Sequence, residues 1–174
     1  DSGIPSVWKQ TYEYASKFME IAQEKDLMNQ DMSSLIIPEL EQGKNGTQKL
    51  GTYLYLVKGK SALGQVNTGS VTNADEMLDK SNADLEKAKE FEPNNIDIYL
   101  ELAKSVLAKG ELAAAKGRTD EREKAENEAL AVLELAVDKS SDKVKAIINL
   151  LNYKVVLVRE SEDEQVVEKF KTLE

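Results

Sequence analysis

The 174-residue chain contains neither cysteine nor histidine. Their absence excludes thiolate nucleophiles, disulfide bonds, zinc sites built from Cys and His, and every catalytic triad that needs an imidazole. Carboxylates, lysines, tyrosines and serines remain, and nothing in the sequence places two carboxylates for acid–base chemistry. We therefore expect a protein that is not an enzyme and that holds no metal or other cofactor.

Proline, glycine and long apolar runs are also scarce. The chain has three prolines and nine glycines, and no apolar window is long enough to span a membrane. It is 41% hydrophobic and 32% charged. Glu, Lys, Ala and Leu dominate, and all four are good helix formers. This composition is typical of a folded helical protein and not of a disordered chain.

The charge balance is acidic, with a formal net charge of −9. Such a surface repels phosphate backbones, so we expect no nucleic-acid partner. The sequence begins with Asp and not Met, which fits a processed chain or an excised piece. Its location stays open between the cytoplasm and export after removal of a signal peptide.

Apolar periodicity predicts an amphipathic helix over roughly 5–28, where Pro5 suits the first helical turn. The residues that recur at helical spacing are Trp8, Tyr12, Ala15, Phe18, Met19 and Ala22. We interpret the aromatic residues as a lid on the rest of the molecule, with ligand stacking as the alternative. A short apolar segment interrupted by Pro38 follows. Residues 1–47 are therefore predicted to form an N-terminal helical cap.

Six further helices are predicted in residues 48–174. They cover 48–66, Asn73 to about Phe91, Ile96 to either Gly110 or Gly117, Asp120 to about Asp138, Ser140 to about Val158, and a last helix after a capping box at Ser161. The last helix carries Val166, Val167, Phe170 and Leu173 on one face.

Apolar positions recur at fixed offsets along these helices. Tyr53, Tyr99 and Ile147 lie 46 and then 48 residues apart. The same offsets relate Leu56, Leu102 and Leu150, and also Val57, Ala103 and Leu151, while Leu85–Leu133 and Ala88–Ala136 are 48 apart. This pattern of large and small residues resembles the tetratricopeptide repeat (TPR) family over about residues 48–160. The departure is length, because a TPR unit has about 34 residues. The excess at 65–81 and 111–128 either lengthens the helices or forms loops.

The resemblance implies an all-α fold, a right-handed α-solenoid of about three antiparallel helix pairs. The repeats would occupy residues 48–174 and the N-terminal cap residues 1–47, in one compact domain, since terminal repeats need a cap.

The resemblance also implies a concave groove lined by the first helix of each pair. Its predicted lining is one row of Leu54, Leu100 and Ile148 and a second row of Lys58, Lys104 and Asn152. Apolar anchors beside two ammonium groups suit a peptide that carries apolar residues and a carboxylate. The alternative is that the apolar row is ordinary core and the lysines are ordinary solvated residues.

We therefore expect a non-catalytic protein–protein interaction scaffold whose partner is a protein or peptide, with acidic character favoured. The alternative is an exported helical protein that binds a small molecule or serves as a transport accessory, and a homo-oligomer stays open. Gly59-Lys60-Ser61 does not make a phosphate-binding loop, because Leu54 stands where that motif requires glycine. Acidic clusters near Asp120 and Glu162 are interpreted as helix starts and not as metal sites.

Overall fold

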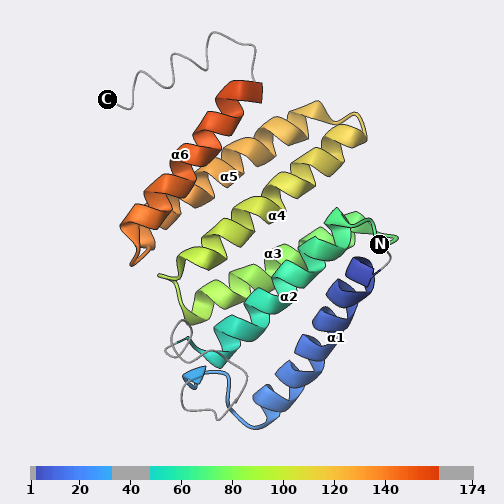
Figure 1. Cartoon of the computed structure of the whole chain (residues 1–174), viewed down its shortest axis with the longest axis vertical. Helices are drawn as coiled ribbons and strands as arrows, with labels where there is room; N and C mark the ends of the chain where they lie inside the picture. Colours follow the sequence, from blue (N-terminus) through green and yellow to red (C-terminus); the bar gives the residue numbers. More distant parts are fainter. Residues whose placement is uncertain (1–2, 33–47, 161–174) are drawn as a thin grey trace.

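The protein is described by a computed structural model over residues 3–32 and 48–160, with side chains over 7–32 and 48–156 (Figure 1). The described residues form the helices α1 (Gly3–Glu24), α2 (Leu50–Asn67), α3 (Ala74–Phe91), α4 (Ile96–Ala115), α5 (Thr119–Lys139) and α6 (Lys143–Glu160). Within these ranges there is no strand, and Asp31 and Lys49 form an isolated bridge. The all-α prediction is confirmed. The predicted segment around Pro38 and the predicted last helix lie outside the described residues.

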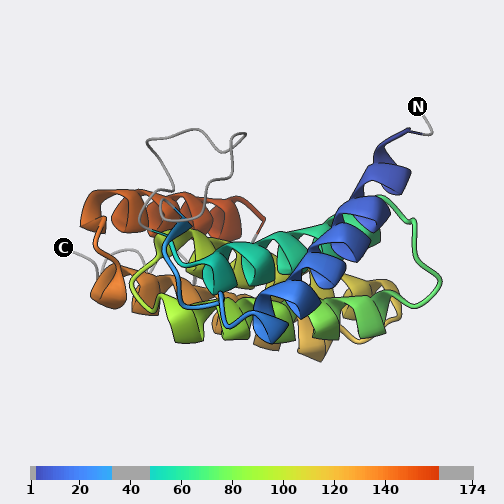
Figure 2. The ribbon, with the colours of Figure 1, turned by 90° about the horizontal axis from the view of Figure 1, so that it is seen from below.

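The helices stack as antiparallel neighbours in two layers. Each helix packs against the next one in the chain, and α4 also contacts both α2 and α6. Figure 2 shows α2 and α6 in one layer and α3 and α5 in the other. The helix α1 packs against α2 at one end of the stack, and α6 forms the other end. This arrangement is that of a helical repeat array.

Local capping interactions set the starts of two of these helices. The side chain of Asn73 accepts a hydrogen bond from the backbone N–H of Glu76 at 3.3 Å, which confirms the predicted cap of α3. Asn95 accepts from the N–H of Asp97 at 3.1 Å and caps α4 in the same way. The predicted start of α6 at Ser140 is wrong, because Ser140 is the C-cap of α5 and the helix begins at Lys143.

The extra residues of the repeats lengthen the helices. The helix α4 passes through Gly110 and continues to Ala115, so Gly110 does not end it. A Cβ atom at Gly110 would lie 2.6 Å from the Cβ of Ala125 on α5. The glycine therefore allows α4 and α5 to approach closely. Only residues 68–73 join α2 to α3, and only 116–118 join α4 to α5.

The repeated apolar positions are buried where helices meet. The leucine pair Leu85 and Leu133 and the alanine pair Ala88 and Ala136 are all at most 5% exposed. Their shared burial shows that positions 48 residues apart have the same packing role in α3 and α5. In the row of Tyr53, Tyr99 and Ile147, Tyr99 of α4 is 2% exposed and Ile147 of α6 is 44% exposed, so the pattern weakens at the end of the array.

Candidate binding groove between α2 and α4

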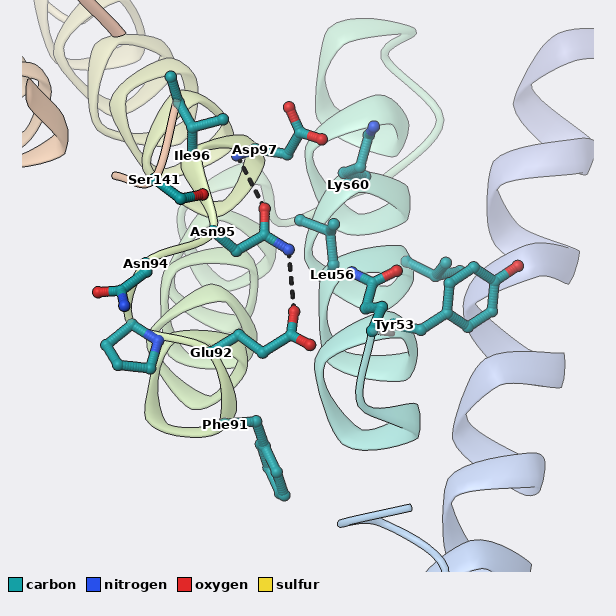
Figure 3. Close-up of a pocket in the computed structure, with 13 residues that line it drawn as sticks. Tyr53, Leu56, Lys60, Phe91, Glu92, Asn94, Asn95, Ile96, Asp97 and Ser141 are labelled. Carbon is teal, nitrogen blue, oxygen red and sulfur yellow. Dashed lines mark hydrogen bonds between the residues drawn. The ribbon is translucent and has the colours of Figure 1, made fainter. Parts of the chain in front are cut away.

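A cleft of about 670 Å³ opens between α2, the α3–α4 turn and the first turn of α4 (Figure 3). The contribution of α2 is Tyr53, Leu56, Val57 and Lys60. Leu56 and Val57 each lie three or four residues from both Tyr53 and Lys60, so the four residues share one face of the helix. Phe91, Ile96 and the polar residues of the turn complete the lining. The cleft therefore combines an apolar wall with a polar rim.

Hydrogen bonds hold the rim of the cleft in place. Glu92 Oε1 accepts from the backbone N–H of Lys49 at 2.7 Å, and Glu92 Oε2 accepts from Asn95 Nδ2 at 3.0 Å. The Asn95–Glu92 bond is one of the dashed lines in Figure 3. Both carboxylate oxygens thus have partners within the protein. The turn is tied to the N-terminus of α2 and does not depend on a ligand for its shape.

A hydrogen bond from Tyr99 also stabilises the α3–α4 turn. Its hydroxyl donates to the carbonyl oxygen of Pro93 at 2.5 Å, and the ring is nearly fully buried. Burial, with a smaller contribution from Glu86, raises the pKa of the Tyr99 hydroxyl. The hydroxyl therefore stays protonated and continues to donate at neutral pH.

Two lysines share one buried carboxylate beside the cleft. Lys104 Nζ lies 2.9 Å from Glu101 Oε1, and Lys60 Nζ lies 3.6 Å from the same oxygen. The Glu101 side chain is only 11% exposed, whereas those of Lys60 and Lys104 are 46% and 62% exposed. Two cations therefore face one anion at Glu101, while the carboxylates of Glu92 and Asp97 lie in the lining of the cleft itself.

Leu54 and Lys58, two of the six predicted groove residues, lie against α1. Leu54 is 2% exposed and packs in a cluster with Met19 and Ala22 of that helix. Lys58 Nζ lies 3.2 Å from Asp84 Oδ1 and 5.3 Å from the centre of the Tyr12 ring. Leu54 thus packs against α1, Lys58 contacts both α1 and α3, and neither residue lines the cleft.

The other four predicted residues lie on α4 and α6. Leu100 is half-buried against the core between α4 and α5, and Lys104 is exposed beside Glu101. Ile148 and Asn152 are exposed on α6. That these six residues together line a groove for a partner remains a prediction. What the structure brings together is Lys104 and Lys60.

Lys60 is the residue that sequence reasoning missed. The sequence carried a usable signal, because Lys60 continues the repeated row of Tyr53, Leu56 and Val57 by one helical turn. Its partner Glu101 gave no comparable signal, since a glutamate inside a helix is usually solvated.

The described residues contain no group of three acidic side chains that could hold a metal ion. Among the described helices, none combines the length and the hydropathy needed to cross a membrane. Comparison of the chain with protein-family models, curated proteins and solved structures finds no match. The TPR resemblance therefore stays a prediction, resting on the repeated offsets given above.

Proposed function

We propose that this protein is a non-catalytic interaction scaffold that binds an acidic segment of a protein partner in the groove between α2 and α4. The observation that carries the proposal is the pairing of Lys60 and Lys104 with one buried Glu101 beside a preformed cleft. The apolar wall and the two ammonium groups recognise different parts of the same segment.

The cleft supplies the site for an apolar anchor. Its volume of about 670 Å³ falls in the range of roughly 300–1,000 Å³ that is usual for binding pockets. Leu56 and Val57 form its apolar wall on α2, with Tyr53 one turn away. A side chain from the partner that fills this space removes apolar surface from water, which favours binding.

The lysine pair supplies the charge recognition. Glu101 neutralises one of the two ammonium groups, so a carboxylate from the partner can pair with the other. Exposed ion pairs contribute about 0.2–1 kcal/mol each and are screened by salt. Since the net charge of −9 repels anions elsewhere, the pair determines where and in which register an acidic segment binds.

Binding of a small molecule is the second candidate, because the volume of the cleft would also accommodate one. Thermal shift with a small-molecule panel tests it, since a ligand that binds the folded state raises the unfolding temperature. A compound bound through the apolar wall should retain its effect when Lys60 and Lys104 are both changed to Glu.

The scaffold proposal is tested by selecting peptides from a displayed library on the wild-type protein. We expect the selected peptides to combine acidic residues with an apolar anchor. Their affinity should fall about tenfold or more in Lys60→Glu plus Lys104→Glu, a loss of roughly 1.4 kcal/mol, since the change replaces one attractive ion pair by repulsion from two new carboxylates.

The matched control is Lys109→Glu plus Lys116→Glu, which changes the net charge equally. These lysines are exposed and pair with Asp79 and Asp75 of α3, away from the cleft. The control should bind as the wild type does. Selected peptides without acidic residues, or equal losses in both double variants, would contradict the proposal.

A further inference from the structure

The last described helix exposes an apolar face to solvent. Six apolar side chains of α6 are between 39% and 68% exposed: Val144, Ile147, Ile148, Leu151, Val155 and Val156. Four of them repeat at alternating four- and three-residue spacing and form a stripe, which we call the outer α6 face: Val144, Ile148, Leu151 and Val155. On the other side of the helix, Leu150 and Tyr153 pack against the α4–α5 core.

The first helix has a similar stripe at the opposite end of the stack (Figure 1). Four apolar side chains of α1 are between 40% and 67% exposed, and we call them the outer α1 face: Val7, Tyr14, Phe18 and Ile21. They follow one another at seven-, four- and three-residue spacing, so they share one side of the helix. The neighbouring side carries Met19 and Ala22, which pack against Leu54 of α2. Apolar stripes of this spacing are typical of helix surfaces that pack against another helix.

Helices inside the stack have a packed neighbour on each side. The helix α4 packs against both α3 and α5, whereas α1 packs mainly against α2 and α6 mainly against α5. The exposure of the two outer faces shows that no described helix covers them. Each end of the described stack therefore has an apolar surface that can receive one more helix.

We propose that the outer α1 face of one copy of this chain docks on the outer α6 face of a second copy, so that the protein assembles head to tail. A contact between two different faces leaves one face free at each end of the assembly. Further copies therefore add until a ring closes, or they form an open chain. This inference goes beyond the proposed function and does not depend on the cleft between α2 and α4.

The charges beside the two faces are complementary. The helix α6 has four cationic residues and one acidic residue. The helix α1 has two lysines and three exposed glutamates, Glu13, Glu20 and Glu24. Lys145 and Lys154 of α6 already pair with acidic residues of their own chain, so the attraction between the two helices fixes partner and register more than it strengthens binding.

Contacts between two like faces are less favourable. If two outer α6 faces packed antiparallel, with Val144 of one copy opposite Val155 of the other, Lys145 of one copy would lie level with Lys154 of the other. Two outer α1 faces would bring their glutamates close together. Because like charges placed opposite each other disfavour an interface, the second copy offers α1 and not α6 to the outer α6 face.

The two faces also match in size. At 1.5 Å per residue, the stripe from Val7 to Ile21 extends about 21 Å and the stripe from Val144 to Val155 about 17 Å. The ten exposed apolar side chains of the two helices present on the order of 1,000 Å², and stable interfaces bury about 1,200–2,000 Å² in total. The contact is therefore at the lower end of the range for stable interfaces, and we expect association that increases with protein concentration.

Charge substitutions on one face at a time test the proposal in the full chain. Tyr14→Lys places a cation opposite the lysines of α6, and Leu151→Glu places an anion opposite the glutamates of α1. Both side chains are at least 48% exposed, and circular dichroism checks that each variant keeps the fold. The matched control is Leu135→Glu on α5, which is 41% exposed and lies outside both faces. In sedimentation velocity, the control should associate as the wild type does, and each face variant at least about tenfold more weakly.

Mixing the two face variants identifies the pairing. Tyr14→Lys keeps an intact outer α6 face and Leu151→Glu keeps an intact outer α1 face, so the mixture should form a one-to-one dimer that grows no further. Continued self-association of either variant alone would overturn the proposal, because it would show that two like faces pair. A wild type that stays monomeric at about 1 mM would also overturn it, and would show that no second copy occupies the faces.

Discussion

Lys58 Nζ of α2 lies 3.2 Å from Asp84 Oδ1 of α3, on the side of α2 that packs against α1. The two side chains are 14% and 12% exposed. The rings of Tyr12 and Tyr55 lie 5.3 and 5.8 Å from the same ammonium group. The ion pair therefore joins α2 to α3, and the contact with the Tyr12 ring adds α1 to the same cluster.

Substitution of Lys58 and substitution of Asp84 should reduce the stability of the protein by different amounts. Burial raises the pKa of the Asp84 carboxyl, and Lys58 offsets this only in part. Lys58→Met should thus cost about 3–5 kcal/mol, because it leaves a buried carboxylate uncompensated. Asp84→Asn should cost less, and the double variant should be close to the wild type or more stable. Urea unfolding followed by circular dichroism measures all three. A greater loss in Asp84→Asn than in Lys58→Met would contradict the asymmetry.

The same pair predicts how stability depends on pH. Without Lys58, the folded-state pKa of Asp84 should rise further above the ordinary value of about 3.9. The folded state then binds the proton more tightly than the unfolded state. The stability gained from this tighter proton binding by Asp84 is full below about pH 4 and is lost as the pH rises through the folded-state pKa. The unfolding free energy of Lys58→Met should therefore drop further below the wild type between about pH 4 and pH 7. A difference in unfolding free energy between the two proteins that becomes smaller over this range would contradict the prediction.

The packing of α1 can be tested through its tryptophan, the only one in the chain. A Cβ atom at Gly64 of α2 would lie 2.5 Å from Cδ2 of Trp8. Gly64→Ala should therefore displace the indole, shift its fluorescence to longer wavelength and cost about 1–3 kcal/mol. Gly110→Ala introduces a similar clash with Ala125 between α4 and α5. It should reduce stability without a shift in the emission of the folded protein, and equal shifts in both variants would contradict the assigned packing.

Two asparagine variants distinguish the role of the cleft rim in binding from the effect of losing a helix cap. Asn95→Ala removes the cap of α4 and the hydrogen bond to Glu92. It should cost about 1–2 kcal/mol and also weaken binding of the selected peptides. Asn73→Ala removes the corresponding cap of α3, away from the cleft. We expect a similar loss of stability and unchanged peptide affinity for this control. Equal peptide affinities in the two variants would show that the rim takes no part in binding.

Helix positions and repeat spacing were predictable because they depend on local patterns. Leu85 and Leu133, which the 48-residue offset relates, are both buried in the structure. Gly110 was ambiguous, since a glycine ends some helices and permits close packing in others. Its contact with Ala125 decides the matter and joins two helices that periodicity treats separately.

The surroundings of each groove position were not predictable in the same way. The register of Lys58 with Lys104 follows from the repeat, but the repeat contains no information about α1. Lys58 pairs with Asp84 of α3 and lies near the Tyr12 ring of α1, while Lys60 faces the cleft. Such differences between equivalent positions arise from tertiary contacts at the end of an array, where a cap replaces the missing repeat.

The central claim is that the lysine pair beside the cleft recognises an acidic segment. The most direct test is the affinity of a selected peptide for the wild type and for Lys104→Ala, measured at low and at high salt. We predict a loss of about two- to fivefold in Lys104→Ala at low salt, a weaker salt dependence, and convergence of the two affinities at high salt. Equal affinities and equal salt dependence in the two proteins would contradict the claim.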